Sequence, residues 1–160
     1  MRTAEKITIK AARPCDIEQA RGLFLEYAAS LNFPLCFQNF EQEVAALPGK
    51  YSPPRGMLLL AFCGGAIAGC GALRSLDENV CEMKRLYVRP EFRCQGIGRI
   101  IAERLIGEAK RIGYALMRLD TIPKQMREAN RLYRLLGFYE ITAYYDNPQP
   151  GAAYMELQLR

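Results

Sequence analysis

A chain of 160 residues, 50% hydrophobic and 24% charged, has the composition of a single globular domain that can bury a sizeable core. It contains no histidine, which excludes Ser-His and Cys-His triads and every zinc site with a histidine ligand. No apolar run approaches the roughly 20 residues of a membrane span, and the N-terminal MRTAEKITIK lacks the apolar segment of a signal peptide, so we expect a cytoplasmic protein with no membrane partner.

The net charge of +5 is unevenly distributed along the chain. Residues 1–80 carry 8 basic and 8 acidic side chains, whereas residues 81–160 carry 14 basic and 9 acidic ones. Such an asymmetry suits either nucleic acid or a small polyphosphorylated ligand. Because the sequence holds no recognised nucleic-acid motif and no basic run longer than two residues, we favour the small anion and expect no nucleic-acid partner.

The six cysteines are scattered without a C-x-x-C pair, and several lie within apolar strand patterns. Reduced thiols in a cytosolic protein explain this distribution better than a disulfide framework or a metal site. We therefore expect no bound metal.

In the N-terminal half, apolar periodicity predicts a strand, two helices and then an antiparallel meander of three strands. Asp16, with Gln19 three residues later, can cap the first helix. The proline-containing stretch 50–56 cannot be regular structure, and Gly64-Gly65 is a two-residue hairpin turn. The expected ranges are strand 7–12, a helix whose apolar stripe runs over 17–31, helix 40–47, and strands 57–63, 66–73 and 81–89.

In the C-terminal half, helix and strand patterns alternate. A helix that starts at Ile97 ends at Gly113, where a left-handed residue is favoured. The strand after it follows the meander through a helix, which implies a parallel crossover. The further expected ranges are strand 114–121, helix 126–136, and strands 138–141 and 153–159.

Between strand 81–89 and the next helix lies a basic glycine turn with the sequence RCQGIG, residues 93–98. A helix start presents unpaired amide hydrogens and a positive dipole end of about half a charge. Gly96 and Gly98 let the backbone approach a ligand closely, and Arg93 and Arg99 flank the amides. A phosphate or pyrophosphate group is therefore the ligand that this turn suits best.

Two well-known phosphate-binding patterns fit the turn poorly. A Walker A loop ends in GK[ST], and Arg99-Ile100 does not supply that ending. A dinucleotide fingerprint needs a third glycine where Ile101 stands, although Asp120 does end the next strand about 20 residues on. That fingerprint also places its glycines directly after a strand, whereas residues 90–95 intervene here.

A family resemblance fits better. The segment LYVRPEFRCQGIGR is similar to the acyl-CoA-binding motif of the GNAT superfamily of N-acyltransferases, a strand ending near V-x-P followed by R/Q-x-x-G-x-G/A. The segment EANRLYRLLGFYE resembles the second motif of that family, and the order of the strands is also the family's order. The matching residues are Arg93, Gly96 and Gly98 in the first motif, and Asn130, Tyr133 and Gly137-Phe138 in the second.

This resemblance implies a single GNAT N-acetyltransferase domain over residues 1–160, with an α/β fold. The expected sheet is mixed and mostly antiparallel, with a parallel, splayed central pair and helices on both faces. It also implies acetyl-CoA as co-substrate, with the pyrophosphate on the backbone amides of the turn and the pantetheine arm along the central strand. The implied donor-binding residues are Leu86, Tyr87, Val88, Arg93, Cys94, Gln95, Gly96, Ile97, Gly98, Arg99 and Asn130.

Acyl transfer to an amine needs a deprotonated amine, a polarised carbonyl and an acid for the departing thiolate. Glu82 lies four residues before Leu86 and six before Val88, so a period of two predicts one common strand face. The resemblance implies that Glu82 is the general base, directly or through water. It implies that Tyr133, with an ordinary pKa of about 10, is the general acid.

We expect direct attack of a primary amine on acetyl-CoA in a ternary complex, with segments 32–55 and 144–150 contacting the acceptor. A small amine or amino acid fits better than a protein tail, because nothing long or strongly acidic lines these segments. A non-catalytic acyl-CoA sensor is an alternative that would keep the turn without needing Glu82 or Tyr133, and a basic nucleic-acid-binding domain is a third. A homodimer is compatible with the sequence, and the identity of the acceptor stays open.

Overall fold

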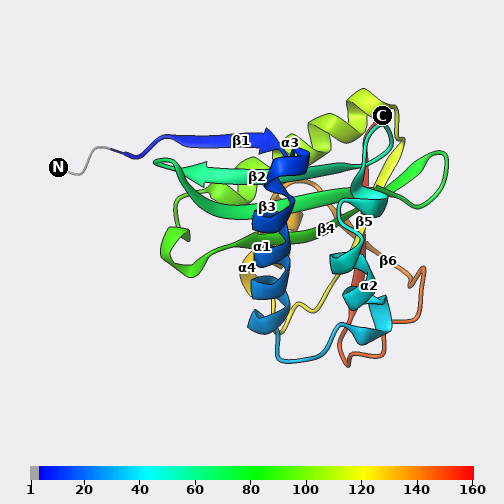
Figure 1. The fold of residues 1–160 in the computed structure, drawn as a ribbon. Coiled ribbons are helices and arrows are strands. Elements are labelled where there is room, and N and C mark those ends of the chain that lie inside the picture. The colour runs from blue at the N-terminus through cyan, green and yellow to red at the C-terminus, as the bar shows by residue number, and fades with distance from the viewer. Residues whose placement is uncertain (1–3) are drawn as a thin grey trace.

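A computed structural model describes residues 4–160 and shows a seven-stranded mixed sheet with the strand order β1-β2-β3-β4-β5-β7-β6 (Figure 1). Residues 1–3 lie outside the described residues. They are the first residues of the N-terminal stretch for which we expect no signal peptide. The strands are β1 (Ile7–Ala11), β2 (Met57–Cys63), β3 (Ala66–Ser75), β4 (Val80–Val88), β5 (Leu116–Thr121), β6 (Tyr139–Ile141) and β7 (Ala153–Gln158). The helices are α1 (Ile17–Ser30), α2 (Phe40–Ala45), α3 (Ile97–Ile112) and α4 (Arg127–Leu135).

The sheet has one parallel pair among the strands described here, β4 with β5, and all its other pairs are antiparallel. Helix α3 connects these two strands, which is the crossover that a parallel pair requires. The expected mixed sheet, and the antiparallel meander that precedes the turn, are therefore confirmed.

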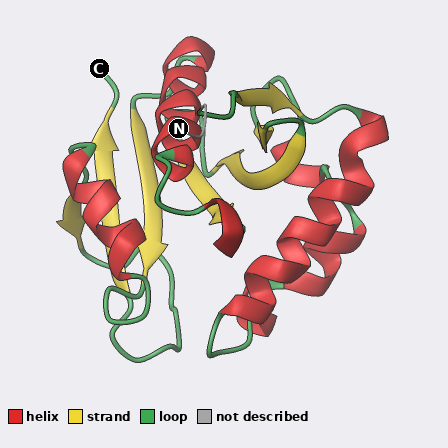
Figure 2. Ribbon diagram, turned by 90° about the vertical axis from the view of Figure 1, so that its left-hand side faces the viewer, coloured by secondary structure: helices red, strands yellow, loops and turns green. Residues whose placement is uncertain are grey.

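Each face of the sheet carries its own core, and Figure 2 shows helices on both sides of the strands. On one face, Ile101 and Leu105 of α3 pack with 0% exposure, and α4 adds Tyr133 to the same core. On the other face, Leu23 and Phe24 of α1 are also 0% exposed. The apolar periodicity of each helix thus covers one face of a shared sheet, which is what stabilises this layered arrangement.

The expected elements are all present, with ends that differ by up to two residues. Gly113 ends α3 at φ 110°, a left-handed conformation that glycine adopts readily, as expected. Two local expectations were wrong. The stretch 50–56 contains the end of a 3₁₀ turn, Gly49–Tyr51. The Asp16 carboxylate does not cap α1, because it accepts a 2.8 Å hydrogen bond from the backbone amide of Arg13 and a 3.0 Å bond from Lys10.

All six cysteines are free thiols: residues 63, 70 and 81 are buried, and residues 15, 36 and 94 are exposed. Within residues 4–160, no helix combines the length and the apolar content that crossing a membrane requires.

Candidate active site

The site is organised by an opening in the middle of the sheet. Strands β4 and β5 pair only over Val80–Glu82 and Leu116–Arg118, after which they diverge. On its other side, β4 stays paired with β3 as far as Val88. From Met83 to Val88, the edge of β4 that faces β5 therefore has no strand partner in the described part of the chain. Apart from the Val88 carbonyl, which accepts a hydrogen bond from Arg93, the backbone groups of this edge are available to a ligand. The expected splayed pair is confirmed.

A β-bulge at Arg85 changes which side chains of β4 share a face. Lys84 pairs with Ala72 and Tyr87 pairs with Cys70, so β4 advances three residues where β3 advances two. Arg85, inside this interval, has a φ of 59°. Both neighbours of Glu82 in the sequence belong to the core under α3, and Leu86 and Val88 pack against that same core. Glu82 therefore lies on the α1 side of the sheet. The expectation of one common face for Glu82, Leu86 and Val88 was wrong, because the inserted residue shifts the alternation by one.

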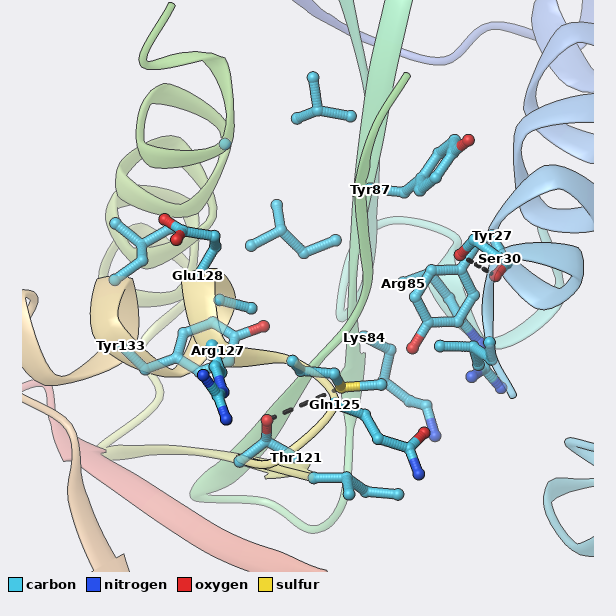
Figure 3. Close-up of a pocket in the computed structure, with 18 of the residues that line it drawn as sticks. Tyr27, Ser30, Lys84, Arg85, Tyr87, Thr121, Gln125, Arg127, Glu128 and Tyr133 are labelled. Carbon is cyan, nitrogen blue, oxygen red and sulfur yellow. Dashed lines mark hydrogen bonds between the residues drawn. The ribbon is translucent and has the colours of Figure 1, made fainter. Parts of the chain in front are cut away.

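A cavity of about 640 Å³ occupies the opening, within the size range of small-molecule sites. Figure 3 shows Tyr133 of α4 on one side of β4 and Tyr27 of α1 on the other. Of the residues expected in the site, the cavity is lined by Leu86, Tyr87, Val88, Arg93, Cys94, Gly96, Ile97, Gly98 and Tyr133. Glu82, Gln95, Arg99 and Asn130 are not among its lining residues.

The glycine turn forms one end of the cavity. Gly96 is the residue before α3 and has a φ of 79°, and a Cβ built on it meets no atom within 4 Å, so the space above it is open. The first amides of α3 have no carbonyl four residues earlier in the helix to bind. The Arg93 guanidinium donates a 3.0 Å hydrogen bond to the Val88 carbonyl, which fixes the turn to the end of β4. The turn can therefore hold an anion on backbone amides, as the sequence predicts.

Gln95 of the turn and Arg99, the residue that follows the turn, do not line the cavity. Gln95 accepts a 3.6 Å hydrogen bond from the thiol of Cys63, and Arg99 forms a 2.9 Å ion pair with Glu103 on the exposed surface of α3. A role in donor binding for either residue stays a prediction, and the backbone amides are the groups that each could contribute.

Tyr133 is 8% exposed and packs edge-to-face on Phe138, with 5.7 Å between ring centroids. Its hydroxyl makes no hydrogen bond to any of residues 4–160, and the side chain lines the cavity. Burial raises the pKa of Tyr133 above its ordinary value, and Tyr27 and Asp120 raise it further. The phenol therefore keeps its proton at neutral pH and provides an unused hydrogen-bond donor at the cavity.

Asn130 lies on α4 three residues before Tyr133. Its Oδ1 is buried without a hydrogen-bond partner in the part of the chain that the structure describes. A buried amide oxygen usually has a partner. Because Asn130 does not line the cavity, its contact with the donor stays a prediction from the family resemblance.

Glu82 is 0% exposed and lies behind the cavity wall. Its carboxylate accepts a 2.8 Å hydrogen bond from Arg74 and a 2.5 Å bond from the Tyr144 hydroxyl, and Lys84 is 3.8 Å away. Burial, followed by the charge of Glu82, raises the pKa of Tyr144. Because these contacts occupy the carboxylate, the role of general base for Glu82 stays a prediction from the family resemblance.

Three polar residues line the α1 side of the cavity: Gln38, Lys84 and Asp120. Gln38 lies in segment 32–55, which we expect to contact the acceptor, whereas no sequence pattern places Lys84 or Asp120 in the site. Gln38 belongs to a 3₁₀ turn, Cys36–Gln38, between α1 and α2, and the other two come from β4 and β5. The sequence pattern identifies Asp120 only as the end of a strand. Its position in the site follows from the divergence of β4 and β5, which no local sequence pattern predicts.

The described residues contain no group of three His, Cys, Asp or Glu side chains that could hold a metal ion.

Comparisons with known proteins give a consistent result. Residues 22–138 match the family model described as the acetyltransferase (GNAT) family. An uncharacterized N-acetyltransferase of Schizosaccharomyces pombe is 37% identical over 162 residues, which cover 99% of this chain and 99% of that protein.

Solved structures share the fold. The crystal structure of a GNAT-family acetyltransferase from Staphylococcus aureus has a TM-score of 0.79 at 20% identity, covering 97% of this chain and 100% of that one. A proposed acetyltransferase from Salmonella typhimurium, whose structure holds its cofactor acetyl-CoA, has a TM-score of 0.69 at 22% identity and covers 96% of this chain and 94% of its own.

Proposed function

Because the chain belongs to the acetyltransferase (GNAT) family of N-acetyltransferases, we propose that it moves the acetyl group of acetyl-CoA to the primary amine of a small molecule by direct attack. One observation carries the proposal. A single cavity joins the glycine turn, the unpaired edge of β4 and the free Tyr133 hydroxyl. An anion site, a strand edge and a proton donor are the three features that binding and cleaving an acyl-CoA thioester require.

The residues present fit the donor. The open space above Gly96 and the first amides of α3 would hold the pyrophosphate, and the edge from Leu86 to Val88 would hydrogen-bond the pantetheine arm. The contact of Asn130 with that arm, which the family resemblance implies, requires the buried Oδ1 to become exposed when the donor binds. The Salmonella protein of the same fold binds acetyl-CoA, which supports the same donor here.

The chemistry of the step sets the demands on the protein. The amine nitrogen forms a bond to the acetyl carbon, the carbon–sulfur bond breaks, and the sulfur takes one proton to become the thiol of CoA. Tyr133 is the residue that we assign to give this proton, since its hydroxyl is protonated, buried and free of other partners. Of the two protons that an ammonium acceptor loses, one restores the Tyr133 hydroxyl and the other leaves to solvent.

The proposal is tested by the release of CoA thiol from acetyl-CoA in the presence of a panel of small primary amines and amino acids. Tyr133→Phe should lower kcat about a hundredfold, the lower part of the range for general acid–base catalysis, while the acetyl-CoA Kd stays within about twofold. Tyr139→Phe is the matched control, because Tyr139 lies exposed on β6 and its hydroxyl contacts Glu156 outside the cavity. If the Tyr133→Phe variant has the same kcat as the unmodified protein, Tyr133 serves only in packing.

The non-catalytic alternative makes a different prediction. A sensor module would bind acetyl-CoA tightly, and no amine in the panel would release thiol. A cytoplasmic location, where the donor and small amines are both available, and a homodimeric state belong to the proposal as predictions.

A further inference from the structure

The cavity continues through the opening of the sheet to the α1 side, beyond the part assigned to the donor. There it is lined by residues from α1, the turn after α1, β4, β5 and the segment before β7. The polar members that the following argument uses are Gln38, Lys84, Asp120 and Asn147. This second part is where an acceptor can reach the thioester from the side opposite the glycine turn.

Asp120 brings a carboxylate without a cationic partner to this part of the cavity. Its Oδ2 accepts hydrogen bonds from Asn147 Nδ2 at 3.0 Å, from Gln38 Nε2 at 3.4 Å and from the Tyr145 hydroxyl. Its Oδ1 has no hydrogen-bond partner among residues 4–160, and no lysine or arginine of that range pairs with it. A partly buried anion held by neutral donors is a site for a cation, and a protonated amine is the cation that an N-acetyltransferase must bind.

Lys84 brings the opposite charge. Its side chain is 8% exposed, and its Nζ donates a 3.0 Å hydrogen bond to Gln38 Oε1. The neighbouring cations are already neutralised, since Arg74 pairs with Glu82 at 2.8 Å and Arg85 pairs with Glu43 at 2.8 Å.

The Glu82 carboxylate, which pairs with Arg74, also lies 3.8 Å from the ammonium group of Lys84. One carboxylate is therefore shared between two cations. Burial and the charge of Arg85 lower the pKa of Lys84, and the charges of Glu82 and Asp120 offset this only in part. An anionic group of a ligand would supply that partner.

Gln38 shows how close together the two charges are. One amide group bridges them, with its oxygen on Lys84 and its nitrogen on Asp120. An α-amino acid presents the same order of groups at a similar spacing, with a carboxylate to accept from the lysine and an ammonium to donate to the aspartate. Lys84 keeps a further N–H and Asp120 keeps its Oδ1, so both can bind a ligand beside the amide.

We propose that Asp120 and Lys84 form the acceptor subsite and that the acceptor is an α-amino acid, whose ammonium group binds Asp120 and whose carboxylate binds Lys84. This inference rests on the proposed acetyltransferase function and narrows its acceptor class. A small amine without an acid group would leave Lys84 buried and only partly paired, which disfavours it against the amino acid.

The test compares free amino acids with their methyl esters in the thiol-release assay, using the unmodified protein. The ester keeps the amine and removes the negative charge. For the amino acid that reacts best, kcat/KM should exceed that of its ester about tenfold or more, the size of effect expected when a charged partner is lost. An ester that reacts as well as the free acid would overturn the proposal.

Substitutions at the two charged residues provide an independent test of the proposal. Lys84→Met should lower kcat/KM for the amino acid about tenfold or more and change that for the ester less than about threefold, while Asp120→Asn should lower both. Lys110→Met, on the exposed end of α3, is the matched control. The acetyl-CoA Kd of each variant reports whether the donor half is intact. If the Lys84→Met variant loses kcat/KM equally for the acid and the ester, and its acetyl-CoA Kd is unchanged, Lys84 has a structural role and does not bind the acceptor carboxylate.

A failure of the proposed reaction remains separable from a failure of this subsite. If no amine releases thiol, the rise in melting temperature that amino acids and their esters produce with CoA bound still measures the subsite. A rise with the acids alone supports it, and the absence of any rise overturns it.

Discussion

Replacing Glu82 with Gln should destabilise the protein more than it slows the reaction. Glu82 is the residue for which sequence and structure favour different roles, a general base in one case and a buried anion that holds Arg74 and Tyr144 in the other. The substitution keeps the shape of the side chain and removes its charge. It therefore separates a structural role from a catalytic one.

The expected loss of stability follows from the two short contacts. A hydrogen bond to a charged group contributes about 1.5–3 kcal/mol and a neutral one about 0.5–1.5 kcal/mol, so each contact should lose about 1 kcal/mol. The amide can still accept from Arg74 if its NH₂ group turns toward Tyr144, whose hydroxyl can accept. The Arg74 side chain is 26% exposed, so solvent limits the penalty of leaving its charge unpaired.

A loss of about 2 kcal/mol corresponds to a melting temperature lower by roughly 4–8 °C for a domain of this size. Thermal unfolding measured by circular dichroism gives this shift, and kcat/KM is measured 15 °C or so below the variant's transition, where it should change less than about threefold. Glu140→Gln is the control, since Glu140 is exposed on β6. A kcat lower by about a hundredfold at an unchanged melting temperature would refute this reasoning and establish Glu82 as the base.

Three further predictions concern other parts of the chain. Gly96→Val should weaken acetyl-CoA binding about tenfold or more in a titration, because a branched side chain would enter the open space above the turn at a φ of 79°; an unchanged Kd would exclude the turn as the anion site. Gly71→Ala should lower the free energy of unfolding by about 1–3 kcal/mol in a urea titration, because its Cβ would lie 2.5 Å from Cγ2 of Ile101; an unaltered midpoint would mean that α3 can move away freely. Asp16→Asn should lower the melting temperature at pH 7, and the gap to the parent should close as the pH falls below about 3.8. Hydrogen bonds from Arg13 and Lys10 lower the pKa of Asp16 in the folded state, so its contribution is present above the unfolded pKa and lost on acidification; a gap that stays constant down to pH 3 would contradict it.

The parts of the fold and site that could be predicted are those that neighbours in the sequence determine. The helix after the turn, its left-handed end at Gly113 and the open backbone at Gly96 follow from local conformational preferences and a period of 3.6 residues. The parallel crossover follows from the helix that separates β4 and β5, because two parallel strands cannot be joined by a short turn. The position of Tyr133 near the turn came from the family resemblance, which adds the tertiary arrangement that periodicity lacks.

The features that could not be predicted depend on a single inserted residue and on contacts between distant segments. The bulge at Arg85 has no glycine or other local signal, yet it reverses the alternation of every side chain after it. The predicted face of Glu82 was wrong for this reason alone. Gln38, Lys84 and Asp120 come from three separate elements, and only the folded sheet places one amide between the two charges.

The bulge also explains how one strand can serve both substrates of the proposed reaction. In a regular strand, consecutive residues point to opposite faces, so Lys84 and Arg85 could not both lie on the α1 side. With the inserted residue they do, and Glu43 then neutralises Arg85 while Lys84 keeps a cationic group for the cavity. Beyond the bulge, Leu86 and Val88 return to the α3 side, beside the glycine turn. Removing one residue at this position should therefore disrupt acceptor and donor binding together, whereas the substitutions proposed above separate the two.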